Sequence, residues 1–166
     1  MSQSAADIDL FRRAMSRFAT GVAVLTTRTR DIDHAMTANA LTSVSLEPML
    51  LLVCVEREAR FHDAVVEAGI WGLSVLSSAH RPAADWLATR GRPLHAQLDR
   101  IDHHHGPQTG VALLDGALST FECRTTAVHP GGDHSIVETT EGSEKVPFEI
   151  LCLTSAIASY RSSDSL

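Results

Sequence analysis

Two short runs of residues in this 166-residue chain could do chemistry. Residues 37–45 read TANALTSVS, small hydroxyl and amide side chains that lead into the apolar stretch 49–55, MLLLVCV. Residues 131–134 read GGDH, a two-glycine turn that presents a carboxylate and an imidazole. Hydroxyl and amide groups beside an apolar slot can hold a flat polar heterocycle. By composition alone, however, 37–45 is more typical of an edge strand and turn, and 131–134 of a hairpin with a surface histidine.

The order of these motifs resembles the short-chain NAD(P)H:flavin oxidoreductase family, which includes the reductase components of two-component flavin-dependent monooxygenases. The resemblance begins near Phe11 and continues to about Glu141. It implies reduction of FMN or FAD by hydride transfer from NADH or NADPH to flavin N5, with the reduced flavin supplied to a partner monooxygenase. It also implies a homodimer with the flavin in a cleft at the dimer interface.

The same resemblance implies which residues form the site. His134 would be the catalytic residue, a hydrogen-bonding group beside the nicotinamide and the flavin and not a general base, because hydride passes directly between the two rings. Asp133 would fix this histidine or the turn. The residues implied to bind the cofactor are Thr37, Ala38, Asn39, Ala40, Ser43, Val44, Ser45, Cys54, Val55, Glu56, Arg60, Asp133 and His134.

A second hypothesis stays open at this point: a non-catalytic flavin-binding or flavin-carrier protein on the same fold. The family pattern has serine where this chain has Ala40, serine or threonine near Ala59, and glycine at Thr139. The C-terminal basic and aromatic segment of the family is reduced to residues 159–161, SYR. Consumption of NADH in the presence of added flavin distinguishes the two hypotheses.

Two other groups of residues could be mistaken for metal ligands. If residues 103–105, HHH, form a strand, His103 and His105 face one way and His104 the other, so three ligands cannot converge from this run alone. A solvated loop is the more typical reading of such a tract. The cysteines at positions 54, 123 and 152 are far apart and form no CxxC motif, as is typical of small buried residues. We therefore predict no metal site.

Composition excludes several classes of function. The net charge is −6 and the 14 lysines and arginines are scattered, which argues against a nucleic-acid-binding protein. The start of the chain lacks a basic and apolar signal sequence, and no apolar run is long enough to cross a membrane. We expect one cytoplasmic domain over residues 1–166, with residues 1–6 and 162–166 frayed.

The spacing of apolar residues and turn residues predicts the elements that must position the site. Residues 49–55 are apolar throughout, which predicts a strand buried on both faces. Other strands are predicted at 22–27, 35–41, 70–76, 117–128, 135–140 and 148–153, and helices at 8–18, 57–68 and 80–89, with a loop at 91–107. Six or seven strands with helices between them predict a mainly β, antiparallel barrel with peripheral helices. The resemblance makes this a six-stranded split β-barrel of Greek-key type.

Overall fold

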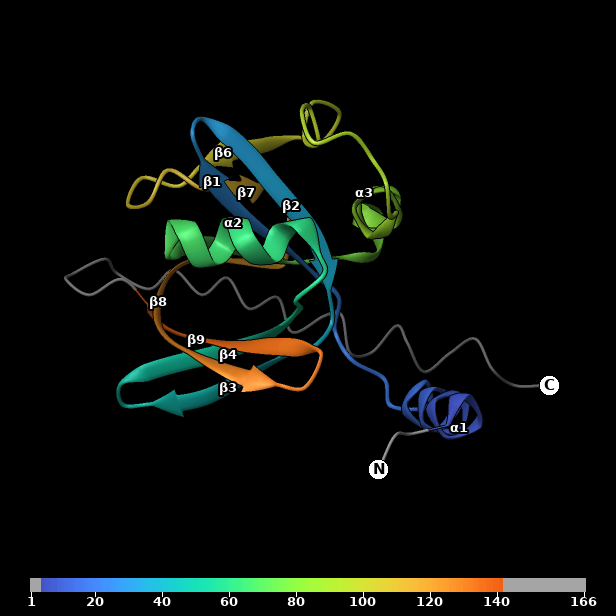
Figure 1. Ribbon diagram of the computed structural model, residues 1–166. Helices are drawn as coiled ribbons and strands as arrows, with labels where there is room; N and C mark the ends of the chain where they lie inside the picture. Colours follow the sequence, from blue (N-terminus) through green and yellow to red (C-terminus); the bar gives the residue numbers. More distant parts are fainter. Residues whose placement is uncertain (1–3, 142–166) are drawn as a thin grey trace.

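A computed structural model describes residues 4–141 of the chain (Figure 1). The predicted strand at 148–153, Cys152 and the segments 159–161 and 162–166 lie outside the described residues. The elements in chain order are α1 (Ala5–Met15), β1 (Ala23–Thr29), β2 (Ile32–Ala38), β3 (Leu41–Leu46), β4 (Met49–Glu56), α2 (Arg60–Ala68), β5 (Ile70–Val75), the short 3₁₀ helix η1 (Ser78–His80), α3 (Arg81–Ala88), β6 (His103–His105), β7 (Ala112–Leu114), β8 (Ser119–Gly131) and β9 (His134–Glu141).

Seven of these strands form one antiparallel sheet in the order β2-β1-β5-β8-β9-β4-β3. The sheet is strongly bent: β1 and β2 lie in one part of the molecule, β3, β4 and β9 in another, and the long strand β8 runs past both (Figure 1). The prediction of a mainly β, antiparallel protein is confirmed. The strand count differs from the expected six within the described residues, because Leu41–Leu46 forms a strand of its own that pairs with β4.

Two apolar clusters cover the two faces of the strands β1 and β5. Inside the bend, Leu25, Trp71 and Val55 pack with Phe61 and Val65 of α2, which lies between the two parts of the sheet (Figure 1). The outer cluster comprises Val24, Ala35, Leu87, Leu98, Ala112 and Leu114. This second cluster holds α3 and β7 against the sheet, and that placement matters because α3 borders the candidate site.

Strand β4 is not buried on both faces, contrary to the sequence prediction. Val53 and Val55 are buried, whereas Leu50, Leu51, Leu52 and Cys54 are half-buried and Met49 is 47% exposed. The reason is the position of β4 next to the edge strand β3: its inward face meets the core, and no described element covers the rest of its other face. A wholly apolar strand with one open face marks a surface that favours contact with another molecule.

The helices begin and end where local sequence chemistry dictates. Ser4 and Asp7 form a reciprocal capping box at the start of α1, so residues 4–6 form its cap and the beginning of its first turn. Helix α2 ends at Ala68, the predicted end of the helix at 57–68. Gly69 follows in the left-handed conformation at φ +63°, which glycine adopts without steric cost. Among the described residues, no helix is long and apolar enough to span a bilayer.

Residues 103–105 form a strand and not the predicted loop. They are β6, which pairs antiparallel with β7, and the sequence analysis did not predict β7. The pairing places His103 opposite Leu114 and His105 opposite Ala112. Leu114 and Ala112 are both fully buried. Because its partner strand packs on the sheet, a polar tract of only three residues is held as a strand by tertiary contacts that its composition does not indicate.

Candidate functional site

A cavity of about 390 Å³ lies where β2, the end of β4, the start of α2 and the segment after α3 meet. Three of the predicted site residues line it: Thr37, Glu56 and Arg60. Each comes from a different element, and the bend of the sheet brings them together. The cavity therefore brings together three of the residues that the sequence predicts to bind the flavin, from three different elements.

Arginine side chains give this cavity its positive charge. Arg92 lines the wall and donates from Nη2 to the Ala35 carbonyl and from Nη1 to the Thr89 carbonyl at 2.9 Å. Its Nε is buried and has no hydrogen-bond partner among the described residues. Burial, with a smaller contribution from the charge of Arg60, lowers the pKa of Arg92 from its ordinary value. A half-buried guanidinium that uses two of its five N–H donors in these bonds is suited to an anionic ligand.

The acidic residues on the cavity wall offset only part of this charge. Arg90 donates from Nη2 to both carboxylate oxygens of Glu56, at 2.8 and 2.9 Å. Arg60 donates to the carbonyl oxygen of Arg92 at 2.6 Å, and within residues 4–141 neither Arg60 nor Arg92 forms an ion pair with an acid. Glu56 is thus neutralised by Arg90, and two cationic groups are available to a ligand. The carboxylate of Glu58, which also lines the cavity, is the opposing charge.

The β2 side of the cavity is polar but uncharged. Thr37 donates its hydroxyl to the Ala84 carbonyl at 2.7 Å, which joins β2 to α3 and leaves the oxygen lone pairs as acceptors. His34 is buried, with its Nε2 2.9 Å from the Thr29 hydroxyl. Burial lowers the pKa of His34, the charge of Asp33 opposes that change and the charge of Arg60 adds to it. His34 is therefore a neutral wall residue near pH 7.

The β8–β9 turn lies next to one wall of this cavity, because His134 pairs with Glu56 across the β4–β9 ladder; neither Asp133 nor His134 lines the cavity itself. Gly132 occupies the turn at φ +74°, a conformation that favours glycine. His134 Nδ1 lies 2.8 Å from Asp133 Oδ1, and the hydrogen bond and charge of His134 lower the pKa of Asp133. The amide of Arg57 donates to the Asp133 carbonyl at 3.0 Å, which fixes the turn to the segment that leads into α2. The predicted pair is therefore positioned as a unit.

The remaining residues of the run 37–45 lie in different environments. The side chain of Ala38 belongs to the inner core, and Asn39 donates to the Thr20 hydroxyl at 3.3 Å. Ala40 is exposed, and its carbonyl accepts from the Cys54 amide at 2.8 Å. Only backbone groups of Ala38 could contact a ligand in the first cavity, because its side chain is enclosed by other residues.

Ser43 and Ser45 line a second cavity, of about 260 Å³, between β3 and β4 on one side and β5 and β8 on the other. Its other walls are mostly apolar and include Leu51 and Phe121. Val44 between the two serines is half exposed. The structure therefore divides the predicted flavin rim between two cavities, with Thr37 in the cationic one and the serines in the apolar one.

Two predicted residues of β4 have restricted roles. Val55 is fully buried in the inner core, so its side chain cannot contact a cofactor. Cys54 is half-buried and forms no disulfide with another described cysteine. Side chains alternate along a strand, so Cys54 and Glu56 face one side and Val55 faces the other. Of the three, only Glu56, at the end of the strand, lines the cavity.

Sequence reasoning missed His34, Arg90 and Arg92, which all line the cationic cavity. The two arginines lie in or next to the segment 91–107, whose lack of periodicity gave no indication of its position in the fold. The available signal was the pair Arg90 and Arg92 in a chain with few basic residues. Their convergence with Arg60 required the tertiary structure.

Residues 15–140 match the family described as "Flavin reductase like domain". The chain is 36% identical over 145 residues to the NADH-dependent flavin reductase of a Rhodococcus species, covering 82% of this chain and 79% of that protein. It is 33% identical to the reductase component of 4-hydroxyphenylacetate 3-monooxygenase from Thermus thermophilus, covering 78% of each chain.

Solved structures agree with these sequence relatives. The flavin reductase component of a bacterial two-component tryptophan halogenase superposes with a TM-score of 0.78 at 43% identity, covering 82% of this chain and 86% of that one. The NADH:FAD oxidoreductase SgcE6 of Streptomyces globisporus, in complex with NAD and FAD fragments, superposes with a TM-score of 0.78 at 32% identity, covering 86% and 84%.

Proposed function

The chain belongs to the flavin reductase like domain family, and on that premise we propose that it is an NADH-dependent flavin reductase that acts on FMN or FAD. The observation that carries this proposal in the structure is the cationic cavity beside the Asp133–His134 turn. NADH is favoured over NADPH because several relatives are named as NADH-dependent enzymes, some for FAD and some for FMN.

The residues present fit a flavin. The unpaired Nε of Arg92 and the uncompensated charge of Arg60 suit a phosphate or pyrophosphate group. On the β2 wall, the Thr37 hydroxyl oxygen offers its lone pairs to a polar ring edge. When bound, flavin supplies an acceptor for hydride at N5. The chain itself binds and orients the two substrates and excludes water, which is the main contribution a protein makes to direct hydride transfer.

His134 has a specific role in this proposal. Its Nδ1 is engaged by Asp133, which fixes the orientation of the ring and leaves Nε2 to contact a substrate. Glu56, its partner across the β4–β9 ladder, lines the cavity. The imidazole thus orients the nicotinamide or the flavin by a hydrogen bond, and no proton need leave the substrate through it.

The product of this reaction implies a second protein. Free reduced flavin is useful only if an enzyme consumes it, and relatives of this chain are named as reductase components of monooxygenases and of a halogenase. We therefore propose a flavin-dependent monooxygenase as the partner. Nucleic acid and membrane are not proposed as partners, and the cytoplasmic location stays a prediction.

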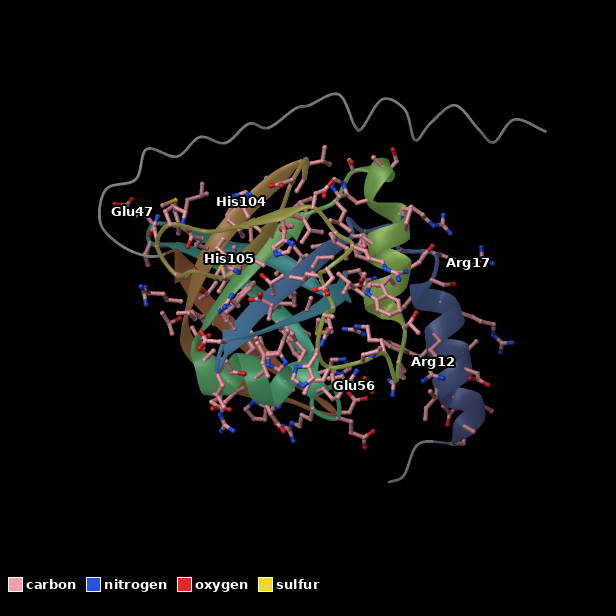
Figure 2. The ribbon with its side chains drawn as sticks, turned by 90° about the horizontal axis from the view of Figure 1, so that it is seen from above. Arg12, Arg17, Glu47, Glu56, His104 and His105 are labelled. Carbon is pink, nitrogen blue, oxygen red and sulfur yellow. The ribbon has the colours of Figure 1, made fainter. Side chains whose placement is uncertain are left out.

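A homodimer is the second part of the proposal. Helix α1 has no buried residue. Phe11 in the helix is 67% exposed, and Phe18 just after its end is 68% exposed. In Figure 1 this helix lies apart from the sheet, and in Figure 2 Arg12 projects from the helix and Arg17 from the segment just after it. A lone helix of 11 residues is marginal in water without an apolar surface to pack on. A second copy of the chain would supply that surface, together with the open face of β4.

The split-barrel description also belongs to this proposal. The bent sheet with α2 inside its concave side is consistent with a split barrel of Greek-key type (Figure 1). The described edges of the sheet are β2 and β3.

Steady-state oxidation of NADH by the full chain, with FMN, FAD or riboflavin as acceptor, tests the proposed function. We expect turnover that saturates in NADH and in flavin, and a higher apparent affinity for FMN or FAD than for riboflavin. Saturable flavin binding without NADH oxidation would overturn the reductase and support the carrier hypothesis. Absence of both would overturn the flavin site itself.

A further inference from the structure

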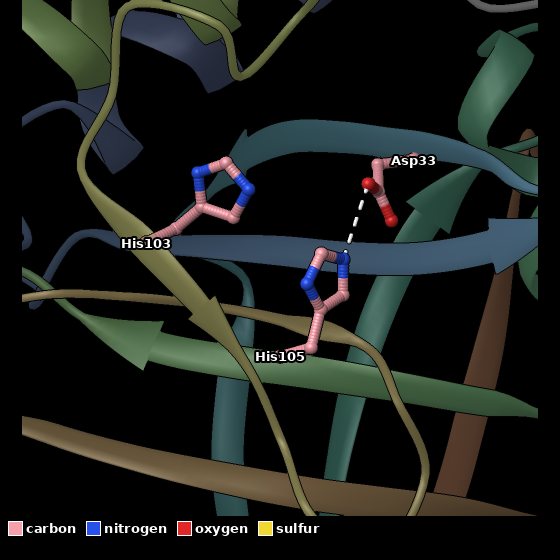
Figure 3. A group of neighbouring side chains, drawn as sticks. All are labelled: Asp33, His103 and His105. Atoms are coloured by element: carbon pink, nitrogen blue, oxygen red, sulfur yellow. Dashed lines mark hydrogen bonds and ion pairs between the residues drawn. The ribbon is translucent and has the colours of Figure 1, made fainter.

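His105, which belongs to a cluster of potential metal ligands, lies away from Glu56 of the cationic cavity (Figure 2). Asp33 on β2 faces His103 and His105 on β6, and one ligand atom from each residue lies within 4.8 Å of the others (Figure 3). Asp33 and His103 are half-buried and His105 is exposed. The tract 103–105 cannot supply three metal ligands by itself. The fold supplies the third ligand, Asp33, from β2.

Both imidazoles present an unprotonated Nε2. A carbonyl oxygen only accepts, so the 2.7 Å contact of His103 Nδ1 with the Ile101 carbonyl places the hydrogen on Nδ1 and the lone pair on Nε2. A guanidinium only donates, so the 2.8 Å contact from Arg28 Nη1 identifies Nε2 of His105 as an acceptor. A backbone carbonyl that orients an imidazole in this way is the usual outer partner of a metal-binding histidine.

The contact between His105 and Asp33 requires a cation. Nε2 of His105 and Oδ2 of Asp33 lie 3.4 Å apart (Figure 3), and both atoms are acceptors. Arg28 Nη1 lies 3.2 Å from each carboxylate oxygen and now provides the positive charge between them. The side chain of Arg28 is 32% exposed and its other terminal nitrogen lies 3.7 Å from the exposed Asp31, so it can move toward solvent and retain an acidic neighbour.

We propose that Asp33, His103 and His105 bind one divalent transition-metal ion of the Zn²⁺ class in the position now held by the Arg28 guanidinium. Tetrahedral zinc bonds of about 2.0–2.2 Å place neighbouring ligand atoms about 3.3 Å apart. The His105–Asp33 pair already has this spacing, and the His103 ring, whose centroid is 5.6 Å from that of His105, closes the third side by a small side-chain movement. Two imidazoles and one carboxylate suit zinc, nickel or copper better than magnesium or calcium.

The ion would join β6 to the edge strand β2. No pairing of the main sheet includes β6, whose ladder is formed with β7 alone. A bound ion therefore stabilises the folded chain by mass action, because the three ligands come together only in the fold.

Titration of the full chain with Zn²⁺, followed by calorimetry and by the thermal unfolding temperature, tests this site. We expect saturable binding of one ion and a rise in the unfolding temperature. His103→Ala, His105→Ala and Asp33→Asn should each weaken that binding at least about ten-fold, since loss of even an outer partner of a metal ligand costs about 10–100-fold. Arg28→Met should tighten it, because the competing guanidinium is removed.

His104→Ala is the matched control, because it removes a histidine from the same tract on the opposite face. The Nδ1 atom of His104 lies 2.6 Å from Asp115 Oδ1, and His104 is not a member of the cluster. Binding should be unchanged in this variant. If His104→Ala weakens zinc binding as much as His103→Ala does, the tract binds adventitiously and the proposal is wrong. Unchanged binding in folded His103→Ala and Asp33→Asn variants, or no saturable binding at about 100 µM in the wild type, also overturns it.

Discussion

His134 lies directly opposite Glu56 in the antiparallel ladder between β4 and β9. Residues in such a pair have their side chains on the same side of the sheet, and Glu56 lines the cationic cavity. Strand register therefore holds the histidine that follows the two-glycine turn on the same side of the sheet as a residue that lines the cavity. A shift of β9 by one residue would turn its side chain to the other face.

His134→Ala should lower kcat/KM for NADH about ten- to one-hundred-fold, because one positioned hydrogen bond contributes about 1–3 kcal/mol at a reacting centre. Flavin affinity should change less, since the cavity arginines remain. Steady-state kinetics together with flavin titration measure both effects. His129→Ala is the control, because His129 lies on the same hairpin and pairs with Glu138. Unchanged kcat/KM in the His134 variant would mean that the histidine is structural.

Arg92→Met should weaken FMN binding about ten-fold or more while it leaves riboflavin binding nearly unchanged, because a charge-assisted bond to phosphate is lost. Fluorescence titration with each flavin measures the difference. Arg81→Met is the control, since Arg81 lies on the exposed face of α3 and pairs with Asp85. Equal loss of FMN and riboflavin affinity would contradict a phosphate role and indicate damage to the cavity wall that Arg92 ties to Ala35.

Ala40→Ser should tighten flavin binding about three- to ten-fold, because one neutral hydrogen bond contributes about 0.5–1.5 kcal/mol. The position is exposed, so the added hydroxyl should not disturb packing. Titration of the wild-type and serine variants with FMN and FAD gives the answer. We also expect the wild-type protein to exchange flavin freely and not to purify with a full complement of it. A serine variant that binds flavin no better, or a wild-type protein that purifies saturated with flavin, refutes the inference from the missing hydroxyl.

Acidification should destabilise the fold through His34. Burial lowers its pKa in the folded state, so the unfolded state binds the proton more readily and the free energy of unfolding falls as the pH drops below about 6.5. Above that pH both states are neutral at this residue and the effect is absent. Urea unfolding at several pH values should show a shallower fall in His34→Gln than in the wild type. The exposed His129→Gln variant should keep the wild-type slope.

Phe11→Glu should convert the proposed dimer to a monomer, because it places a charge on the exposed apolar face of α1. Analytical ultracentrifugation or light scattering measures the mass. Arg13→Glu, a charge change on the same helix, should leave the mass unchanged. A wild-type chain that is already monomeric at micromolar concentration would refute the dimer. That result would not contradict the proposed flavin site.

The local features of the fold follow from short stretches of sequence. The two-glycine turn before Asp133, the glycine that ends α2 and the apolar strands are set by backbone chemistry and hydrophobic spacing over a few residues. The order of these motifs was enough to identify the family. The sequence also determined the alternation that sends His104 to one side of its strand and His103 and His105 to the other.

Which of these residues meet depends on the tertiary packing. The long bent sheet and the packing of α3 bring Arg60, Arg90 and Arg92 to one cavity, separate Thr37 from Ser43 and Ser45, and enclose the Val55 side chain in the core. The same packing places Asp33 opposite a histidine tract that is about 70 residues away in the chain. The physical reason is that such convergence depends on the register and bending of strands distant in sequence, and local propensity carries no information about either.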